Sequence, residues 1–196
     1  AAVEEEGGAI YIRVETEGVP AYSYPLGSTD VAALMGRPLA ADDFVDGSPA
    51  VGEGDVVEFG ENIGYNNFNC DLGYWPPGPQ CAASQSVSGL IPLEPIAAGN
   101  TDCETGSSRL GLWVSGTSIY GWTDTHSYNS DGVWENVATK LEVYDLDICG
   151  GHSGFGGEYH HHGSSVCLID LVGDDGTGHS PIYGIAGDGY PVYGPW

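Results

Sequence analysis

The sequence predicts a mainly β protein with short helices and long irregular loops, folded as a single β-sandwich-like or irregular β domain that carries disulfide bonds. Glycine and proline, at 32 and 12 of 196 residues, favour turns and short elements over long helices. Several segments alternate apolar and polar residues, which is the period of a half-buried strand. A hydrophobic content of 41% supplies a core, so we expect the chain to fold.

The first part of the chain, residues 1–107, is predicted to be a β and loop-rich part of this one domain. Residues 9–14 are expected to form a strand, because Ile10, Ile12 and Val14 would share one face. The segments that follow are predicted as a turn at 18–25, a short helix at 32–41, an acidic loop at 42–54 and an irregular loop at 62–80.

The second part, residues 108–196, has clearer patterns. Its predicted elements are strands at 110–114 and 117–122 joined by a Ser115-Gly116 hairpin turn, a short helix at 133–140 with Asp131 as its N-cap, a strand at 166–172, a turn at 173–178 and a strand at 181–186.

The charge balance is strongly acidic, with 28 Asp and Glu against 4 Lys and Arg and a net charge of −24. Nucleic-acid binding is excluded, because it needs clustered basic residues. Adaptation to salt, solubility outside the cell and calcium binding are alternative explanations. The candidate calcium ligands are Asp42, Asp43 and Asp46 in one loop and Asp174 and Asp175 in another.

Cysteine use and the start of the chain predict export to the cell surface or beyond. The five cysteines contain no Cys-x-x-Cys pair, which favours disulfides over structural zinc. Cys149 with Cys167 and Cys70 with Cys81 would close short loops, and Cys103 is then free, paired between chains or left without its partner. The Ala1-Ala2 start resembles what signal-peptide removal leaves. No window is apolar over the roughly 18 residues that a transmembrane segment needs.

The most specific chemical feature is a cluster of histidines. Five of the six lie within 28 residues: His152, His160, His161, His162 and His179. In an extended segment His160 and His162 would share a face and His161 would point the other way. With His152 they form a set suited to zinc or copper, and His179 and Asp188 are further candidates for the metal site. The alternative is a hydrogen-bonded core network of histidines with Tyr159.

A catalytic set is harder to identify than a metal site. Glu158 lies beside the histidines and is the one candidate general base, with a solvated surface carboxylate as the alternative. The nucleophile-elbow pattern places a glycine two residues before the serine and another two residues after it. Ser153 has the first glycine, but Phe155 occupies the position of the second. This excludes a serine hydrolase of that type. Whether the protein is an enzyme stays open at this point.

Several motifs together resemble the YHYH domain family. They run in order as Asp147-Ile-Cys-Gly-Gly-His152, Gly157-Glu-Tyr-His-His-His162, Cys167, His179-Ser-Pro-Ile-Tyr-Gly184 and Asp188-Gly-Tyr-Pro-Val-Tyr-Gly194. The resemblance covers residues 108–196. One departure is that the third position of the eponymous Tyr-His-Tyr-His is His161. The resemblance implies an extracytoplasmic bacterial-type domain of poorly defined activity.

Two hypotheses about function follow from these observations. The first is a secreted or cell-surface protein with a structural metal site, which associates with itself into an extracellular polymer or surface matrix. The abundance of glycine and tyrosine, the leftover Cys103 and the strand edges of a β protein favour it. The second is a metal-dependent hydrolase or copper-dependent oxidase that uses His152, His160 and His162.

Overall fold

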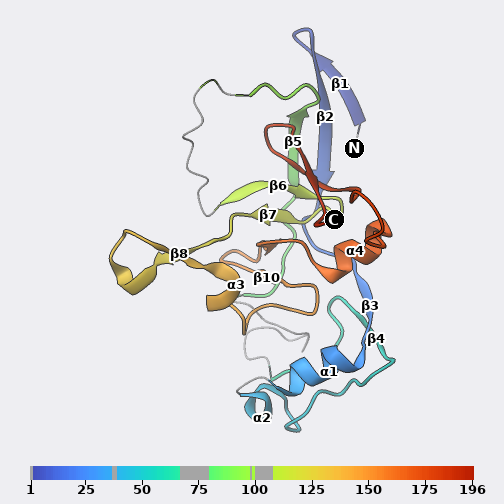
Figure 1. Cartoon of the computed structure of the whole chain (residues 1–196), viewed down its shortest axis with the longest axis vertical. Helices are drawn as coiled ribbons and strands as arrows, with labels where there is room; N and C mark the ends of the chain where they lie inside the picture. The colour runs from blue at the N-terminus through green and yellow to red at the C-terminus, as the bar shows by residue number, and fades with distance from the viewer. Residues whose placement is uncertain (1, 37–38, 67–79, 98, 100–107) are drawn as a thin grey trace.

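The computed structural model describes residues 2–36, 39–66, 80–97, 99 and 108–196, which form several β-sheets and short helices. The predicted β-rich, disulfide-bonded fold class is confirmed. Along the longest axis of the molecule, the β1–β2 hairpin lies at one end and α1 and α2 lie at the other (Figure 1). The strands β6 and β7 lie between them and belong to the sheet that carries the histidines.

This central sheet has six strands among the described residues. Their order is β10 (Gly151–Ser153), β11 (Tyr159–His161), β7 (Ser118–Tyr120), β6 (Arg109–Trp113), β12 (Ile182–Ala186) and β13 (Pro191–Tyr193). The β11–β7 pair is parallel and the other pairs are antiparallel. The predicted hairpin of β6 and β7 and the predicted strand at 181–186 are confirmed.

Glycine is required where β6 and β12 pair. A Cβ atom on Gly111 would lie 2.2 Å from the carbonyl oxygen of Ile185, and one on Gly184 would lie 2.7 Å from that of Leu112. Both distances are far below a normal contact, so only glycine lets the two backbones approach this closely.

A second sheet is built from β1 (Ala2–Glu6), β2 (Ala9–Thr16) and β5 (Val87–Pro92), and β2 confirms the strand predicted at 9–14. The Thr16 hydroxyl donates to the carbonyl of Gly116 over 3.0 Å, which joins this sheet to the β6–β7 turn. A small unit follows, with β3 (Ser23–Pro25), α1 (Ser28–Met35), α2 (Ala40–Asp43) and β4 (Val56–Glu58). Its core consists of Leu26, Leu34, Phe44, Val57 and Ile63.

Residues 166–172 form the helix α4 (Val166–Val172), so the predicted strand there is wrong. The Ser165 hydroxyl caps the helix by accepting from the Leu168 amide, and Gly173 ends it in the left-handed conformation. Leu168 is buried against Trp113 and Tyr183 of the central sheet. This run of seven residues is apolar except for Asp170, and such a short run fits a buried strand or a helix equally well, so only the caps distinguish the two.

The helix predicted at 133–140 is also largely wrong. Its first half is the strand β9 (Glu135–Val137), which pairs with β8 (Thr123–Ser127) after the short 3-10 turn η1 (Tyr128–Ser130). Only α3 (Ala138–Leu141) is helical. Asp131 accepts from the Val133 amide within a turn and so does not cap a helix.

Three predictions for the first part of the chain need correction as well. The segment predicted as a turn at 18–25 ends in β3. The helix predicted at 32–41 is displaced, because α1 ends at Met35 and α2 takes up the start of the acidic loop. Most of the loop predicted at 62–80 lies outside the described residues.

Candidate metal centre

The pairing of β10 with β11 brings three histidines together. His152 lies directly opposite His160 in the antiparallel register, and His162 follows His160 by two residues. Each offers one ligand atom, and the three atoms lie within 4.8 Å of one another. His161 points to the other side and contacts the rings of Trp113 and Tyr159. The predicted alternation along this segment is confirmed.

Backbone carbonyls orient two of the three imidazoles. Nδ1 of His160 lies 3.0 Å from the carbonyl oxygen of Glu158, and Nδ1 of His162 lies 2.5 Å from that of Gly121. When Nδ1 carries the proton, Nε2 has its lone pair free, which is the usual arrangement of a histidine that ligates a metal. Backbone carbonyls, and not carboxylates, therefore orient these two rings.

Glu142 is the residue of the centre that the sequence did not reveal. It follows α3 directly, and its Oε2 lies 3.3 Å from Nε2 of His152 and 3.1 Å from Nε2 of His162. These three atoms are buried, and no well-formed hydrogen bond satisfies them within the described structure. Two imidazole nitrogens and one carboxylate oxygen thus lie buried and close together without such bonds. A set of ligand atoms of this kind fits a zinc or copper ion.

Burial and charge set the protonation of these groups. Burial alone would raise the pKa of Glu142, but His152 and His162 lower it to about 2. Burial lowers the pKa of His160 to about 4, aided by the neighbouring His152. For His162 burial acts in the same direction, yet Glu142 and the Gly121 carbonyl raise its pKa above the ordinary value. Burial lowers the pKa of His161 to about 3.

A cavity of about 240 Å³ borders the centre. Its walls include His152, His160, His162 and Glu142, together with Tyr120, Asp124 and the exposed Phe155. The Tyr120 ring stacks on His160, with centroids 3.9 Å apart and planes inclined by 20°. Burial raises the pKa of Tyr120 to about 12, with a further contribution from Glu158. The ligand atoms therefore have space beside them for a small molecule.

Glu158, the candidate base, is partly buried and paired with Arg109. Its Oε1 accepts from Arg109 at 2.6 and 2.9 Å and from the Ser118 hydroxyl at 2.7 Å. Burial alone would raise the pKa of Glu158, but Ser118 and Arg109 hold it below the ordinary value. These contacts fasten the start of β11 to β6 and β7, which is a structural role.

The structure does not bring His179 and Asp188 to the three histidines. His179 is exposed, pairs with the carbonyl of Ser180 and contacts the Tyr193 ring. Asp188 is exposed in the β12–β13 turn, where it accepts from the Tyr190 amide. Within the described ranges, the acidic loops form no group of three converging ligands. Asp175 accepts from the Thr177 amide of its own turn, and Asp174 accepts from the Gly176 amide and the Tyr183 hydroxyl.

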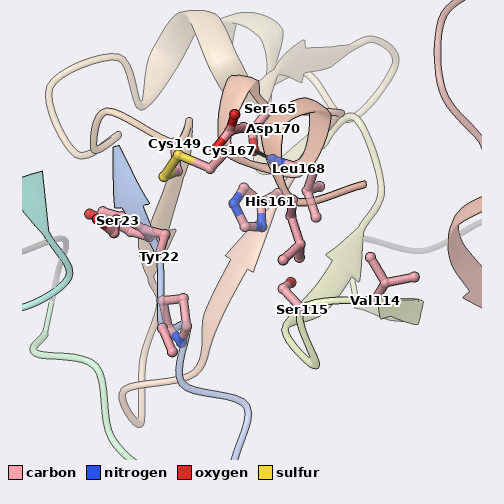
Figure 2. A pocket seen from close by; sticks show the side chains of 13 residues that line it. Tyr22, Ser23, Val114, Ser115, Cys149, His161, Ser165, Cys167, Leu168 and Asp170 are labelled. Carbon is pink, nitrogen blue, oxygen red and sulfur yellow. Dashed lines mark hydrogen bonds between the residues drawn. A yellow bond between two sulfur atoms is a disulfide. The ribbon is translucent and has the colours of Figure 1, made fainter. Parts of the chain in front are cut away.

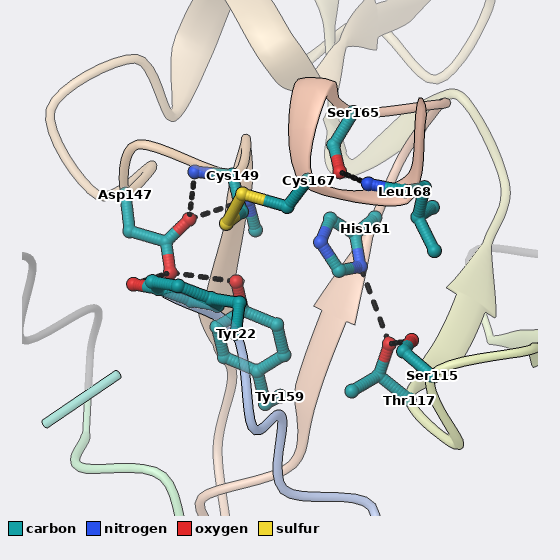
Figure 3. The surroundings of a disulfide bond; sticks show 11 residues. Tyr22, Ser115, Thr117, Asp147, Cys149, Tyr159, His161, Ser165, Cys167 and Leu168 are labelled. Atoms are coloured by element: carbon teal, nitrogen blue, oxygen red, sulfur yellow. Dashed lines mark hydrogen bonds between the residues drawn. A yellow bond between two sulfur atoms is a disulfide. The ribbon is translucent and has the colours of Figure 1, made fainter. Parts of the chain in front are cut away.

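A buried carboxylate and a disulfide position β10. Cys149 and Cys167 are bonded as predicted, which ties the segment before β10 to α4 (Figure 3). Asp147 accepts from Tyr22 and Tyr159 on one oxygen and from the amides of Cys149 and Gly151 on the other. Burial raises the pKa of Asp147 to about 6 despite these four donors.

The other predicted disulfide stays a prediction. Cys81 is disulfide-bonded, whereas Cys70 and Cys103 lie outside the described residues.

Comparisons with known proteins agree with the motifs. A family model described as YHYH protein matches residues 89–196, which is more than half of the chain and begins earlier than the motifs alone indicated. No curated protein and no solved structure matches the sequence. In the part of the chain that the structure describes, every helix is too short or too polar to cross a membrane.

Proposed function

The chain belongs to the YHYH family. We propose that it is an exported metal-binding protein whose metal centre consists of His152, His160 and His162. The observation that carries the proposal is the convergence of the three ligand atoms within 4.8 Å. Zinc and copper are the metals expected, because imidazole ligands suit both.

Glu142 is proposed as the carboxylate of the centre. It would either complete a four-ligand set or position the imidazoles that bind the metal. In both cases its negative charge offsets the positive charge of a divalent cation. The centre then links α3 to β10 and β11, because its donors come from all three. A metal there would stabilise the fold.

A structural metal in a secreted or cell-surface protein is the first interpretation of this centre. The Cys149–Cys167 disulfide supports export, since such bonds persist in oxidising compartments. Self-association into a polymer or surface matrix is part of this proposal. It is supported by large apolar side chains that are mostly exposed, among them Ile96, Trp134 and Phe155.

A metal-dependent hydrolase or copper-dependent oxidase is the second candidate. The observation that favours it is the cavity of about 240 Å³ that borders the three histidines and Glu142. Catalytic metal sites keep a position open to substrate, whereas structural sites are closed. A bound metal would supply Lewis-acid or redox chemistry there. The residues of the chain would orient the ligands and enclose the substrate.

The test is metal analysis of natively purified protein, followed by the His160→Ala variant. We expect one equivalent of zinc or copper in the wild type and its loss in His160→Ala. His179→Ala is the matched control, because it removes an exposed histidine outside the group and should keep the metal. Equal metal content in all three proteins would contradict the proposed centre, and calcium alone would point to the acidic loops.

The same variant separates the two interpretations. If the metal is structural, His160→Ala should unfold at lower denaturant concentration, and EDTA should have the same effect on the wild type. Size analysis with and without EDTA tests self-association, which an unchanged monomer in both conditions would contradict. If the protein is an enzyme, the variant should retain its fold and lose turnover.

A further inference from the structure

A second cavity, of about 330 Å³, lies on the side of β11 that His161 faces. It is separate from the metal centre, because successive side chains of a strand point to opposite faces. Its lining includes Cys149, His161 and Leu168, each at most 3% exposed. The cavity therefore reaches the core of the protein, and its size falls in the range of small-molecule sites.

His161 places one polar atom in this cavity. Its Nδ1 faces the Thr117 hydroxyl at 3.5 Å, and Thr117 in turn contacts the Ser115 hydroxyl at 2.9 Å. No hydrogen bond among the described residues reaches the other nitrogen, Nε2. Figure 3 shows this nitrogen turned away from Thr117, toward the side where Tyr22 and the disulfide lie. A ring nitrogen that borders a cavity and lacks a protein partner gains from a ligand that supplies one.

The rest of the lining restricts the ligand. Leu168, Leu171, Val114 and Pro20 give apolar walls, and the disulfide closes one side (Figure 2). Asp170 is the one charged side chain among the described residues of the lining, and these residues offer no cation to an acid. The net charge of −24 adds to the repulsion of anions. The chemistry favours an uncharged molecule.

We propose that this cavity binds a small neutral molecule with an apolar ring and one hydroxyl group, such as a phenol. The ring packs against Leu168 and Leu171, and the hydroxyl pairs with Nε2 of His161. A hydroxyl fits because it donates to this nitrogen when the nitrogen is bare and accepts from it when it carries the proton. This site is independent of the proposed metal centre and stands or falls without it.

The test uses the full chain in EDTA, so that no metal competes for the phenol. p-Cresol is titrated while the methyl resonances of Leu168 and Leu171 are followed by NMR, and toluene and benzoate are the comparison ligands. We expect saturable one-to-one binding of p-cresol. Toluene should bind about 3- to 10-fold more weakly, the range of one net hydrogen bond. Benzoate should bind more weakly than p-cresol as well.

Two variants complete the experiment. His161→Phe keeps an aromatic ring and removes the nitrogen, so the advantage of p-cresol over toluene should disappear. Ala21→Trp adds bulk at an exposed residue of the lining and should abolish binding of both. If His161→Phe does not fold, the wild-type ligand comparison and Ala21→Trp still decide. Equal affinity for p-cresol and toluene in the wild type, or unchanged binding in Ala21→Trp, would overturn the proposal.

Discussion

Among the residues that the structure describes, Glu142 contributes the one carboxylate within contact distance of two of the clustered histidines. The Glu142→Gln variant keeps the shape of the side chain and removes its charge. We expect zinc affinity to fall about 10- to 100-fold, the usual cost of losing a ligand's supporting group. Competition with a chromophoric chelator would measure it.

Glu135→Gln is the matched control for this variant, because Glu135 is an exposed glutamate of the neighbouring strand β9. It should leave the affinity unchanged. Equal losses in both variants would show that the effect comes from overall charge and not from the centre.

Asp147 makes stability depend on pH in a direction unusual for a carboxylate. Its pKa is raised by burial to about 6, so the folded state binds a proton more tightly than the unfolded state, whose value is 3.8. Stability is therefore lost as pH rises from about 4 to about 6. At about 1.4 kcal/mol per pKa unit, the loss from this residue is about 3 kcal/mol.

The Asp147→Asn variant should lack this loss. Urea unfolding in EDTA at pH 4, 5, 6 and 7 measures the free energy of unfolding of the variant and of the wild type. The difference between the two values should shift in favour of the variant as pH rises. A constant difference across the series would show that Asp147 stays ionised in the fold. An asparagine can still accept from the two amides, so we expect the variant to fold.

Helix α4 is stabilised at its start by one side chain, the N-cap Ser165. Ser165 satisfies the Leu168 amide, and without that bond the short helix loses its cap. Ser165→Ala should destabilise the protein by about 1 kcal/mol. Denaturant titration would measure it, with the exposed neighbour Ser164→Ala as the control. If both variants cost the same, the cap does not stabilise α4.

Strand β11 contributes side chains both to the metal centre and to the second cavity. Its alternation sends His160 toward the metal centre and His161 toward the second cavity, while the Glu158–Arg109 pair fastens its start to β6. A substitution in this strand should therefore be interpreted by the face that it changes.

For the whole molecule, the Cys149–Cys167 bond ties the segment before β10 to α4 and so holds the histidine sheet against its covering helix. Replacing both cysteines with alanine should cost about 3 kcal/mol by the entropy of a loop of this length. Because β10 carries His152, zinc affinity should fall as well.

Urea unfolding in EDTA measures the disulfide contribution without metal, and the chelator competition measures the affinity. Stability and affinity that both match the wild type would contradict this account.

Periodicity and composition were sufficient to predict the β-rich class, the β6–β7 hairpin, the Cys149–Cys167 bond and the alternation of His160, His161 and His162, because each depends on neighbours in sequence or on short spacings. The helix α4 does not follow from periodicity, because a run of seven residues that is apolar except for Asp170 has no diagnostic period, and only the caps Ser165 and Gly173 indicate a helix.

Only the tertiary structure decided which residues meet. Glu142 joins the histidines because the chain after α3 passes His152 and His162, and no spacing in the sequence encodes that approach. His179 lies within the same stretch of sequence as the cluster, yet α4 intervenes between them and His179 contacts Tyr193 of β13 instead. Contact between distant segments depends on how sheets and helices pack, so a local pattern can nominate ligands but cannot assemble them.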